Sequence, residues 1–169
     1  MRRASTVIFK FLGRGMNPIG WVDLKLRGRS VPREPSAPAL RFHVANSSRS
    51  AVLATNLELA DTGARRNKGL LGLDGLAPGE GLWIVPCESV HTFFMRFPID
   101  LVYLDRNYKV KKVRSAVGPW RLSACFTAHS ILELPAGTIR NTQTQRGDLL
   151  EFSPASMLGS GAGEVVHVE

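Results

Sequence analysis

A chain of 169 residues with 44% hydrophobic content can bury one sizeable core, and domains of this length usually occur singly. No apolar run approaches the roughly 18 consecutive residues that a membrane-spanning helix requires, so we expect no transmembrane segment. The formal net charge of +8 would suit a polyanionic partner, but eight of the 22 Lys and Arg residues lie in the first 35 positions, outside the expected domain.

Residues 1–39 read as a basic extension and linker. Prolines at 32, 35 and 38 favour extended backbone and remove hydrogen-bond donors. The charge predicts a solvated tail, with weak contact to anionic surfaces as the alternative. The apolar run near the start is interrupted by Lys10 and is too short for a usual export signal. We therefore expect a cytoplasmic protein, with an exported location as the alternative.

From Leu40 onward, short apolar runs alternate with turn residues, a pattern typical of strands. The turn at 46–48 separates the first two runs. Asp61 and Thr62 can cap a short helix that ends at Gly72. The expected elements are strands at 42–44, 52–54, 82–85, 99–104, 109–113, 130–134 and 149–152, a further strand at 165–168, and helices at 61–72 and 138–145.

This pattern predicts an α+β domain over residues 40–153, followed by a glycine-rich tail at 154–169. Many short strands with only one or two short helices favour a mostly antiparallel, curved sheet that is partly closed like a barrel. The residues between the runs at 99–104 and 109–113 are Asp105, Arg106 and Asn107, which favour a hairpin.

The stretch 91–105 places His91, Arg96 and Asp100 within an otherwise apolar run. A buried charge is costly unless it is paired, so Arg96 and Asp100 are expected to form an ion pair that fixes the turn at Pro98. The alternative is functional: Arg96, helped by Arg66 or Lys68, would bind a carboxylate or phosphate group beside an apolar wall of Phe94 and Trp120.

The other reactive side chains indicate no further site. Cys87 and Cys125 are expected to be free thiols, with a single disulfide as the alternative. The four histidines are widely spaced and lack the spacing of a metal site, and the glycine-rich segments lack the lysine of a phosphate-binding loop. Tyr103, Tyr108, Lys109, Lys111 and Lys112 give only a faint nucleic-acid pattern. We expect no metal and no cofactor.

Several motifs are shared, in order and spacing, with one known family. They are Arg66 with Gly69-Leu70-Leu71-Gly72, Gly81-Leu82-Trp83, His91 to Asp100, Leu104-Asp105, Pro119-Trp120, Cys125, Ile131 to Gly137 and Gly147-Asp148. Over residues 51–152 the chain resembles the domain of unknown function 192 family. The resemblance implies a compact β-rich domain of bacteria and archaea, often exported, and it implies no established activity and no catalytic residues.

Three functions stay open at this point. The first is a binding domain, without catalysis, for a small anionic or polar ligand. The second is a hydrolase or transferase with His91 as base and Asp100 as the residue that orients it. The third is a structural or interaction module that presents a sheet edge. The residues predicted to line the ligand pocket are Arg66, His91, Phe94, Arg96, Asp100 and Trp120.

Overall fold

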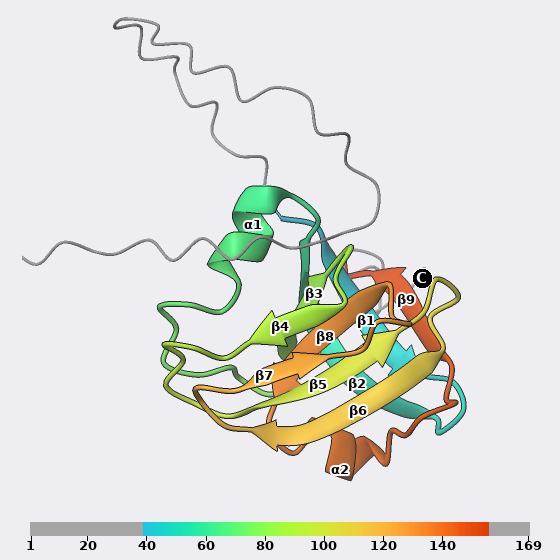
Figure 1. Cartoon of the computed structure of the whole chain (residues 1–169). Coiled ribbons are helices and arrows are strands. Elements are labelled where there is room, and N and C mark those ends of the chain that lie inside the picture. The colour runs from blue at the N-terminus through green and yellow to red at the C-terminus, as the bar shows by residue number, and fades with distance from the viewer. Residues whose placement is uncertain (1–38, 156–169) are drawn as a thin grey trace, which may run out of the picture. The chain divides into compact units, whose positions relative to one another are not determined.

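The structure is a computed structural model and describes residues 39–155. These residues form nine strands and two short helices (Figure 1). The elements in chain order are β1 (Arg41–Asn46), β2 (Ala51–Ala60), α1 (Gly63–Lys68), β3 (Glu80–Ile84), β4 (Ser89–His91), β5 (Ile99–Leu104), β6 (Val110–Val117), β7 (Leu122–Ala124), β8 (Ser130–Pro135), α2 (Thr138–Thr142) and β9 (Leu150–Pro154).

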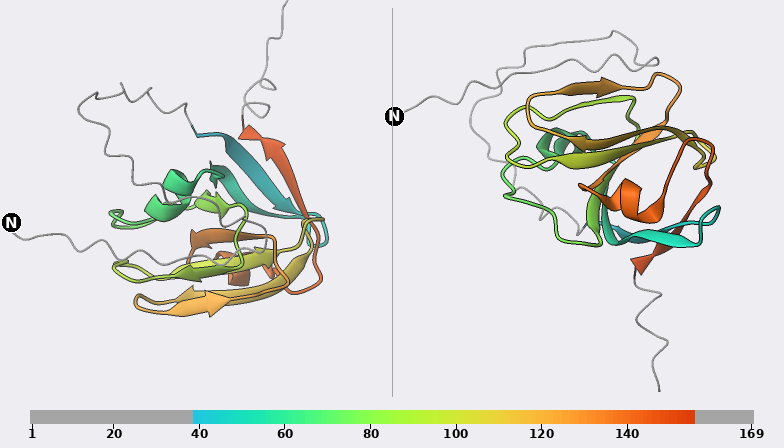
Figure 2. Two further views of the ribbon diagram at one scale, coloured as in Figure 1. Left: turned by 45° about the horizontal axis from the view of Figure 1, so that its top comes forward. Right: turned by 90° about the horizontal axis from the view of Figure 1, so that it is seen from below.

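Seven strands form one sheet in the order β6-β5-β8-β3-β2-β1-β9, and β4 pairs with β7 separately. Within the large sheet only β2 and β3 run parallel. The sheet curls (Figure 2), and a bridge between Lys109 and Leu149 joins its two ends at one corner. The predicted α+β class, with a mostly antiparallel, curved and partly closed sheet, is confirmed.

Each face of the curled sheet carries its own apolar layer. Strand β5 is buried along its whole length, and alternate side chains enter opposite layers. We call the layer to which Val90 of β4 belongs the lid core; its buried members are Ala60, Leu70, Leu82, Ile84, Cys87, Val90, Met95, Ile99, Leu101, Tyr103, Val117, Ala128 and Ile131.

The second layer, the barrel core, lies inside the curve of the sheet, where α2 also lies in the right-hand view of Figure 2. Trp83 is its largest side chain, stacked on Phe152 with ring centroids 4.2 Å apart. The buried members are Val44, Leu53, Ala54, Leu57, Trp83, Val102, Leu104, Val110, Leu132, Leu134, Ile139 and Leu150.

Both helices are shorter than the sequence predicted. The Thr62 side chain accepts a hydrogen bond from the Arg65 amide and begins α1 as expected, but α1 ends at Lys68 because Gly69 adopts φ +49°. The predicted end at Gly72 is wrong. Helix α2 ends at Thr142, where Gln143 adopts φ +52° and donates its amide to helix carbonyls.

The seven strands expected between residues 42 and 152 are all present, with different ends. The strand expected at 165–168 lies outside the described residues. In the part of the chain that the structure describes, no helix is long and apolar enough to cross a membrane.

Candidate functional site

Two loops are joined by Thr92, which is buried at the end of β4. Its amide donates to the carbonyl of Arg121 at 2.9 Å, and its carbonyl accepts from the amide of Trp120 at 3.0 Å. Its hydroxyl donates to the carbonyl of Gly118 at 2.8 Å. These bonds hold residues 92–98 against residues 118–121, so the two most informative segments of the sequence meet here.

The joined loops present a group of rings that we call the aromatic face: His91, Phe93, Phe94 and Trp120. The rings of His91 and Phe93 are stacked with centroids 5.1 Å apart, and Phe93 lies 5.6 Å from Trp120. Phe94 meets Trp120 edge-to-face at 4.8 Å. Phe94 and Trp120 are 63% and 56% exposed. Contiguous exposed aromatic surface of this kind marks interaction sites.

The backbone at both exposed rings is strained. Phe94 has φ +65° and Trp120 has φ +61°, in the left-handed region that residues with a bulky side chain rarely adopt. Such a conformation costs about 1–3 kcal/mol per residue and is concentrated at functional sites. Because both side chains point largely into solvent, burial in the core does not offset this cost.

Substitutions at Phe94 should reveal the strain directly. Phe94→Ala keeps a β-carbon on the left-handed backbone, whereas Phe94→Gly removes it. We expect the free energy of unfolding of Phe94→Gly to exceed that of Phe94→Ala by about 1 kcal/mol, as measured by urea denaturation. The exposed Ser115 of β6 has an ordinary negative φ, so there the alanine variant should be more stable than the glycine variant. Alanine as the more stable variant at position 94 would contradict the assigned strain.

Arg96 lies on the same loop but does not pair with Asp100. Its Nη1 lies 2.5 Å from Oδ1 of Asp74, and the two side chains are 71% and 82% exposed. Asp100 is fully buried and accepts three backbone hydrogen bonds, from Ala116, Gly137 and Ile139 at 2.7–3.1 Å. The predicted Arg96–Asp100 ion pair is wrong, because the two residues lie in different environments.

Asp100 binds amides of β6 and of the start of α2, so its carboxylate is on the side of the sheet that carries the barrel core. Its neighbours Ile99 and Leu101 enter the lid core, on the side of His91. Asp100 therefore cannot orient His91. The hypothesis of a hydrolase or transferase with His91 as base is left without its orienting residue.

Arg66 on α1 is also engaged locally. Its Nη1 donates to the backbone carbonyls of Asp61 and Val85, which ties α1 to the end of β3. Of the six residues predicted to line one pocket, the structure brings together His91, Phe94 and Trp120, with Arg96 on the same loop. Arg66 and Asp100 have structural partners of their own.

Two clefts of about 360 and 220 Å³ are lined by other residues. The larger contains Glu88, Asp105, Arg106, Asn107 and residues 126–129, including the exposed Phe126. Among residues 39–155 no group of three or more His, Cys, Asp or Glu side chains could hold a metal ion. Both cysteines are free thiols.

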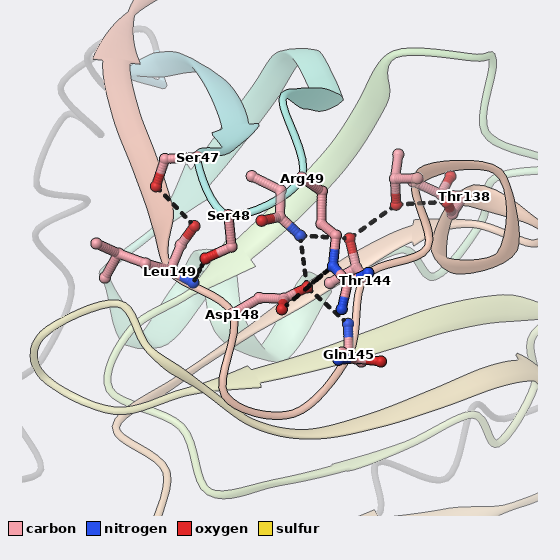
Figure 3. Close-up of polar contacts among 10 residues, drawn as sticks. Ser47, Ser48, Arg49, Thr138, Thr144, Gln145, Asp148 and Leu149 are labelled. Atoms are coloured by element: carbon pink, nitrogen blue, oxygen red, sulfur yellow. Dashed lines mark hydrogen bonds and ion pairs between the residues drawn. The ribbon is translucent and has the colours of Figure 1, made fainter.

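A second polar cluster, which the sequence did not indicate, surrounds Asp148 (Figure 3). The side chain of Asn46 donates to Asp148 at 2.9 Å, the amide of Gln145 at 3.0 Å and the guanidinium of Arg49 at 3.2 Å. Burial by itself would raise the pKa of Asp148, but these hydrogen bonds outweigh it and hold the pKa below the ordinary value. The cluster ties the start of β9 to the β1–β2 turn and therefore reads as structural.

Glu133 on β8 was missed as a chemically distinct residue, although it lies in a shared family motif. The residue as a whole is 4% exposed, and burial raises the pKa of its carboxyl group to about 7. Burial likewise raises the pKa of the Cys87 thiol to about 11, and the nearby charge of Glu133 acts in the same direction. The available signal in the residues was a glutamate within a continuous apolar strand, Ile131-Leu132-Glu133-Leu134.

The model of the DUF192 family (Uncharacterized ACR) matches residues 44–152. A UPF0127 protein of Thermococcus kodakarensis is 30% identical over 117 residues, which cover 66% of this chain and 73% of the relative. A UPF0127 protein of Thermococcus gammatolerans is 30% identical over 115 residues, covering 64% and 74%.

Two solved structures share the fold. The crystal structure of a proposed transcription regulator from Sinorhizobium meliloti has a TM-score of 0.60 at 23% identity and covers 70% of this chain and 97% of that chain. A protein of unknown function from Novosphingobium aromaticivorans has a TM-score of 0.57 at 20% identity, covering 70% and 89%. At these identities the likeness extends to the fold alone.

Proposed function

The chain belongs to the DUF192 family, and we propose that its domain is a binding module that holds a small polar or anionic ligand on the aromatic face. The observation that carries this proposal is the pair Phe94 and Trp120, exposed together on strained backbone. Backbone strain that core packing does not offset is retained where a binding surface needs a particular side-chain direction.

The rings supply one half of the recognition. An exposed tryptophan and phenylalanine, backed by Phe93, offer apolar surface on which a planar group or the CH face of a sugar can stack. Hydrogen bonds of Thr92 fix the two loops before any ligand arrives, which lowers the entropic cost of binding. A preformed surface therefore suits a small ligand.

Charge supplies the other half. Among residues 39–155 Arg96 pairs only with Asp74, in a largely exposed pair, and such pairs contribute about 0–1 kcal/mol. An anionic group that reached Arg96 could therefore replace Asp74 at little cost and gain a charge-assisted, bidentate contact. Residues 39–155 contain fourteen Lys and Arg against ten Asp and Glu, so their net charge also favours an anion.

Binding can be followed through Trp120 fluorescence and thermal shift, with organic acids, nucleotides and sugar phosphates as probes. For a compound that binds, we expect Arg96→Ala and Trp120→Ala each to weaken affinity about tenfold or more, because each removes a direct contact. The matched controls are Arg140→Ala and Phe126→Ala, an exposed arginine on α2 and an exposed phenylalanine of the larger cleft. They should change affinity less than twofold.

Two outcomes would count against the proposal. One is that no probe shifts the melting temperature or the fluorescence beyond error. The other is that the control variants weaken binding as much as Arg96→Ala, which would place the ligand elsewhere.

A further inference from the structure

Three loops gather at one end of the described domain, on the left in Figure 1 and in the left-hand view of Figure 2. They are residues 69–79 between α1 and β3, residues 92–98 between β4 and β5, and residues 118–121 between β6 and β7. We call them the loop end. Hydrogen bonds of Thr92 join the second loop to the third, and the Arg96–Asp74 pair joins the second to the first. The three loops therefore form one connected surface.

The loop end and the adjoining start of β7 expose apolar side chains. Of the ten large apolar side chains that are exposed among residues 39–155, five lie here: Leu71, Leu73, Phe94, Trp120 and Leu122. The first loop is anchored by Leu70 and Leu76, which pack in the lid core, so its other leucines are left to face solvent. Leu122 pairs in register with His91 and so adjoins the aromatic face. Exposed apolar side chains gathered in this way mark an interaction surface.

Two arginines lie beside the exposed rings. Arg96 is two residues after Phe94, and Arg121 follows Trp120 directly, with its Nη1 3.2 Å from the carbonyl oxygen of Trp120. Both arginines are exposed. The three loops contain two arginines against one acid, Asp74, so their formal charge is positive. The surface therefore combines apolar side chains with cations, which suits a partner that is both apolar and anionic.

The form of this surface favours a bilayer over a peptide. Neither of the two clefts described above contains any of the five exposed side chains. Peptides are held in grooves or along free strand edges, whereas the rings of Phe94 and Trp120 stand out from loops. Aromatic rings and leucines that protrude beside arginines suit the headgroup region of an anionic bilayer, where rings meet the acyl boundary and cations meet phosphate.

We infer that the loop end docks on an anionic phospholipid surface. Phe94, Trp120 and Leu122 insert at the level of the headgroups, and Arg96 and Arg121 bind lipid phosphates. Arg96 exchanges its exposed pair with Asp74 for a bidentate contact with phosphate. The inference rests on the proposed function, because it names the source of the anionic group that the aromatic face binds.

Vesicle binding of the full chain tests the inference. The vesicles consist of phosphatidylcholine alone or with about a quarter of phosphatidylglycerol, and bound protein is measured by sedimentation. We expect a partition coefficient at least about tenfold larger on the anionic vesicles. In Trp21→Phe, Trp120 and the buried Trp83 are the remaining tryptophans, so fluorescence then reports on Trp120. Its emission should shift to shorter wavelength on anionic vesicles and be quenched by brominated lipid chains.

Variants identify the side chains that make the contact. Phe94→Ser and Leu122→Ser should each lower the partition coefficient at least about fivefold, because each removes an inserted apolar side chain. Arg96→Ala and Arg121→Ala should each lower it about fivefold on the anionic vesicles and scarcely change it on phosphatidylcholine alone. Because all five of these side chains are exposed, the melting temperature should stay close to that of the wild-type protein.

The matched controls are Phe126→Ser and Arg106→Ala. Both residues are exposed and line the larger cleft, with Arg106 at the opposite end of β5 from the loop 92–98. They should change the partition coefficient less than about twofold, because charges more than a Debye length from the lipid are screened. Every variant retains the basic residues 1–38, so any contact that these make with the vesicles is common to all.

The outcomes separate this inference from the proposed function. Equal partition on both kinds of vesicle would overturn the inference, as would a loss in Phe126→Ser as large as that in Phe94→Ser. If glycerol phosphate binds through Arg96 while vesicles do not bind, the lipid surface is wrong and the proposed function stands. If neither binds, both are contradicted. Binding of a soluble acidic, leucine-rich peptide in place of vesicles would overturn the inference and assign the loop end to a protein partner.

Discussion

Replacement of Asp100 by alanine is expected to lower the free energy of unfolding by about 3–5 kcal/mol, measured by urea denaturation at pH 7. The change would leave the amides of Ala116, Gly137 and Ile139 buried or half-buried without their acceptor. Each unsatisfied buried donor costs about 1–3 kcal/mol. Because Asp100 joins β5 to both β6 and α2, its loss would loosen three elements at once.

Two further variants test this account. Asp100→Asn keeps one carbonyl oxygen and should be less destabilising than Asp100→Ala. Asp74→Ala removes a carboxylate whose only described contact is the exposed pair with Arg96, and should change stability by less than about 1 kcal/mol. A loss below about 1 kcal/mol in Asp100→Ala would show that these amides find other partners.

The stability of the wild-type protein should fall by about 3 kcal/mol between pH 4.5 and pH 7, and Glu133→Gln should abolish most of this fall. Native Glu133 has a pKa of about 7 against 4.5 ordinarily, so in this interval the native state binds more protons than the unfolded state. Stability then decreases as pH rises and is constant above about 7. Since the group is buried, solvent screening scarcely reduces the effect.

The measurement is a series of denaturation curves at pH 4.5, 6 and 7.5. Glu88→Gln, at an exposed glutamate, is the control and should retain the full decrease. Asp148 acts in the opposite sense, because its lowered pKa gives stability that is lost only as pH falls below the ordinary carboxyl range. A wild-type stability that stays flat or rises from pH 4.5 to 7 would show that Glu133 is hydrated in the folded protein.

Long apolar runs with clear turn residues were predictable from the sequence. The hairpin β5–β6 is an example: Oδ1 of Asp105 accepts hydrogen bonds from the amides of Asn107 and Lys109, as an aspartate at that turn position should. Strands β4 and β7 were missed, because three residues are too few to show a period. Their pairing joins Ser89 to Ala124, and sequence alone gives no sign of so distant a contact.

The candidate site was predictable as a stretch but not as a set of contacts. Arg96 and Asp100 are four residues apart and suggested an ion pair. A loop separates them, however, and the alternation of β5 directs Asp100 to the barrel core. The actual partner of Arg96 is Asp74, 22 positions earlier, in a loop whose position depends on the whole fold. The left-handed backbone at Phe94 and Trp120 likewise has no signature in residue type.

The position of β6 at one end of the large sheet has a consequence for the protein in concentrated solution. An outer strand offers free backbone groups to which a strand of another molecule could add. Strand β6 carries Lys111, Lys112 and Arg114. The ammonium of Lys112 lies over the ring of Tyr103 and donates to the carbonyl of Ala124. An added strand would have to bring these cations together with their copies, so sheet-to-sheet aggregation is opposed along this side.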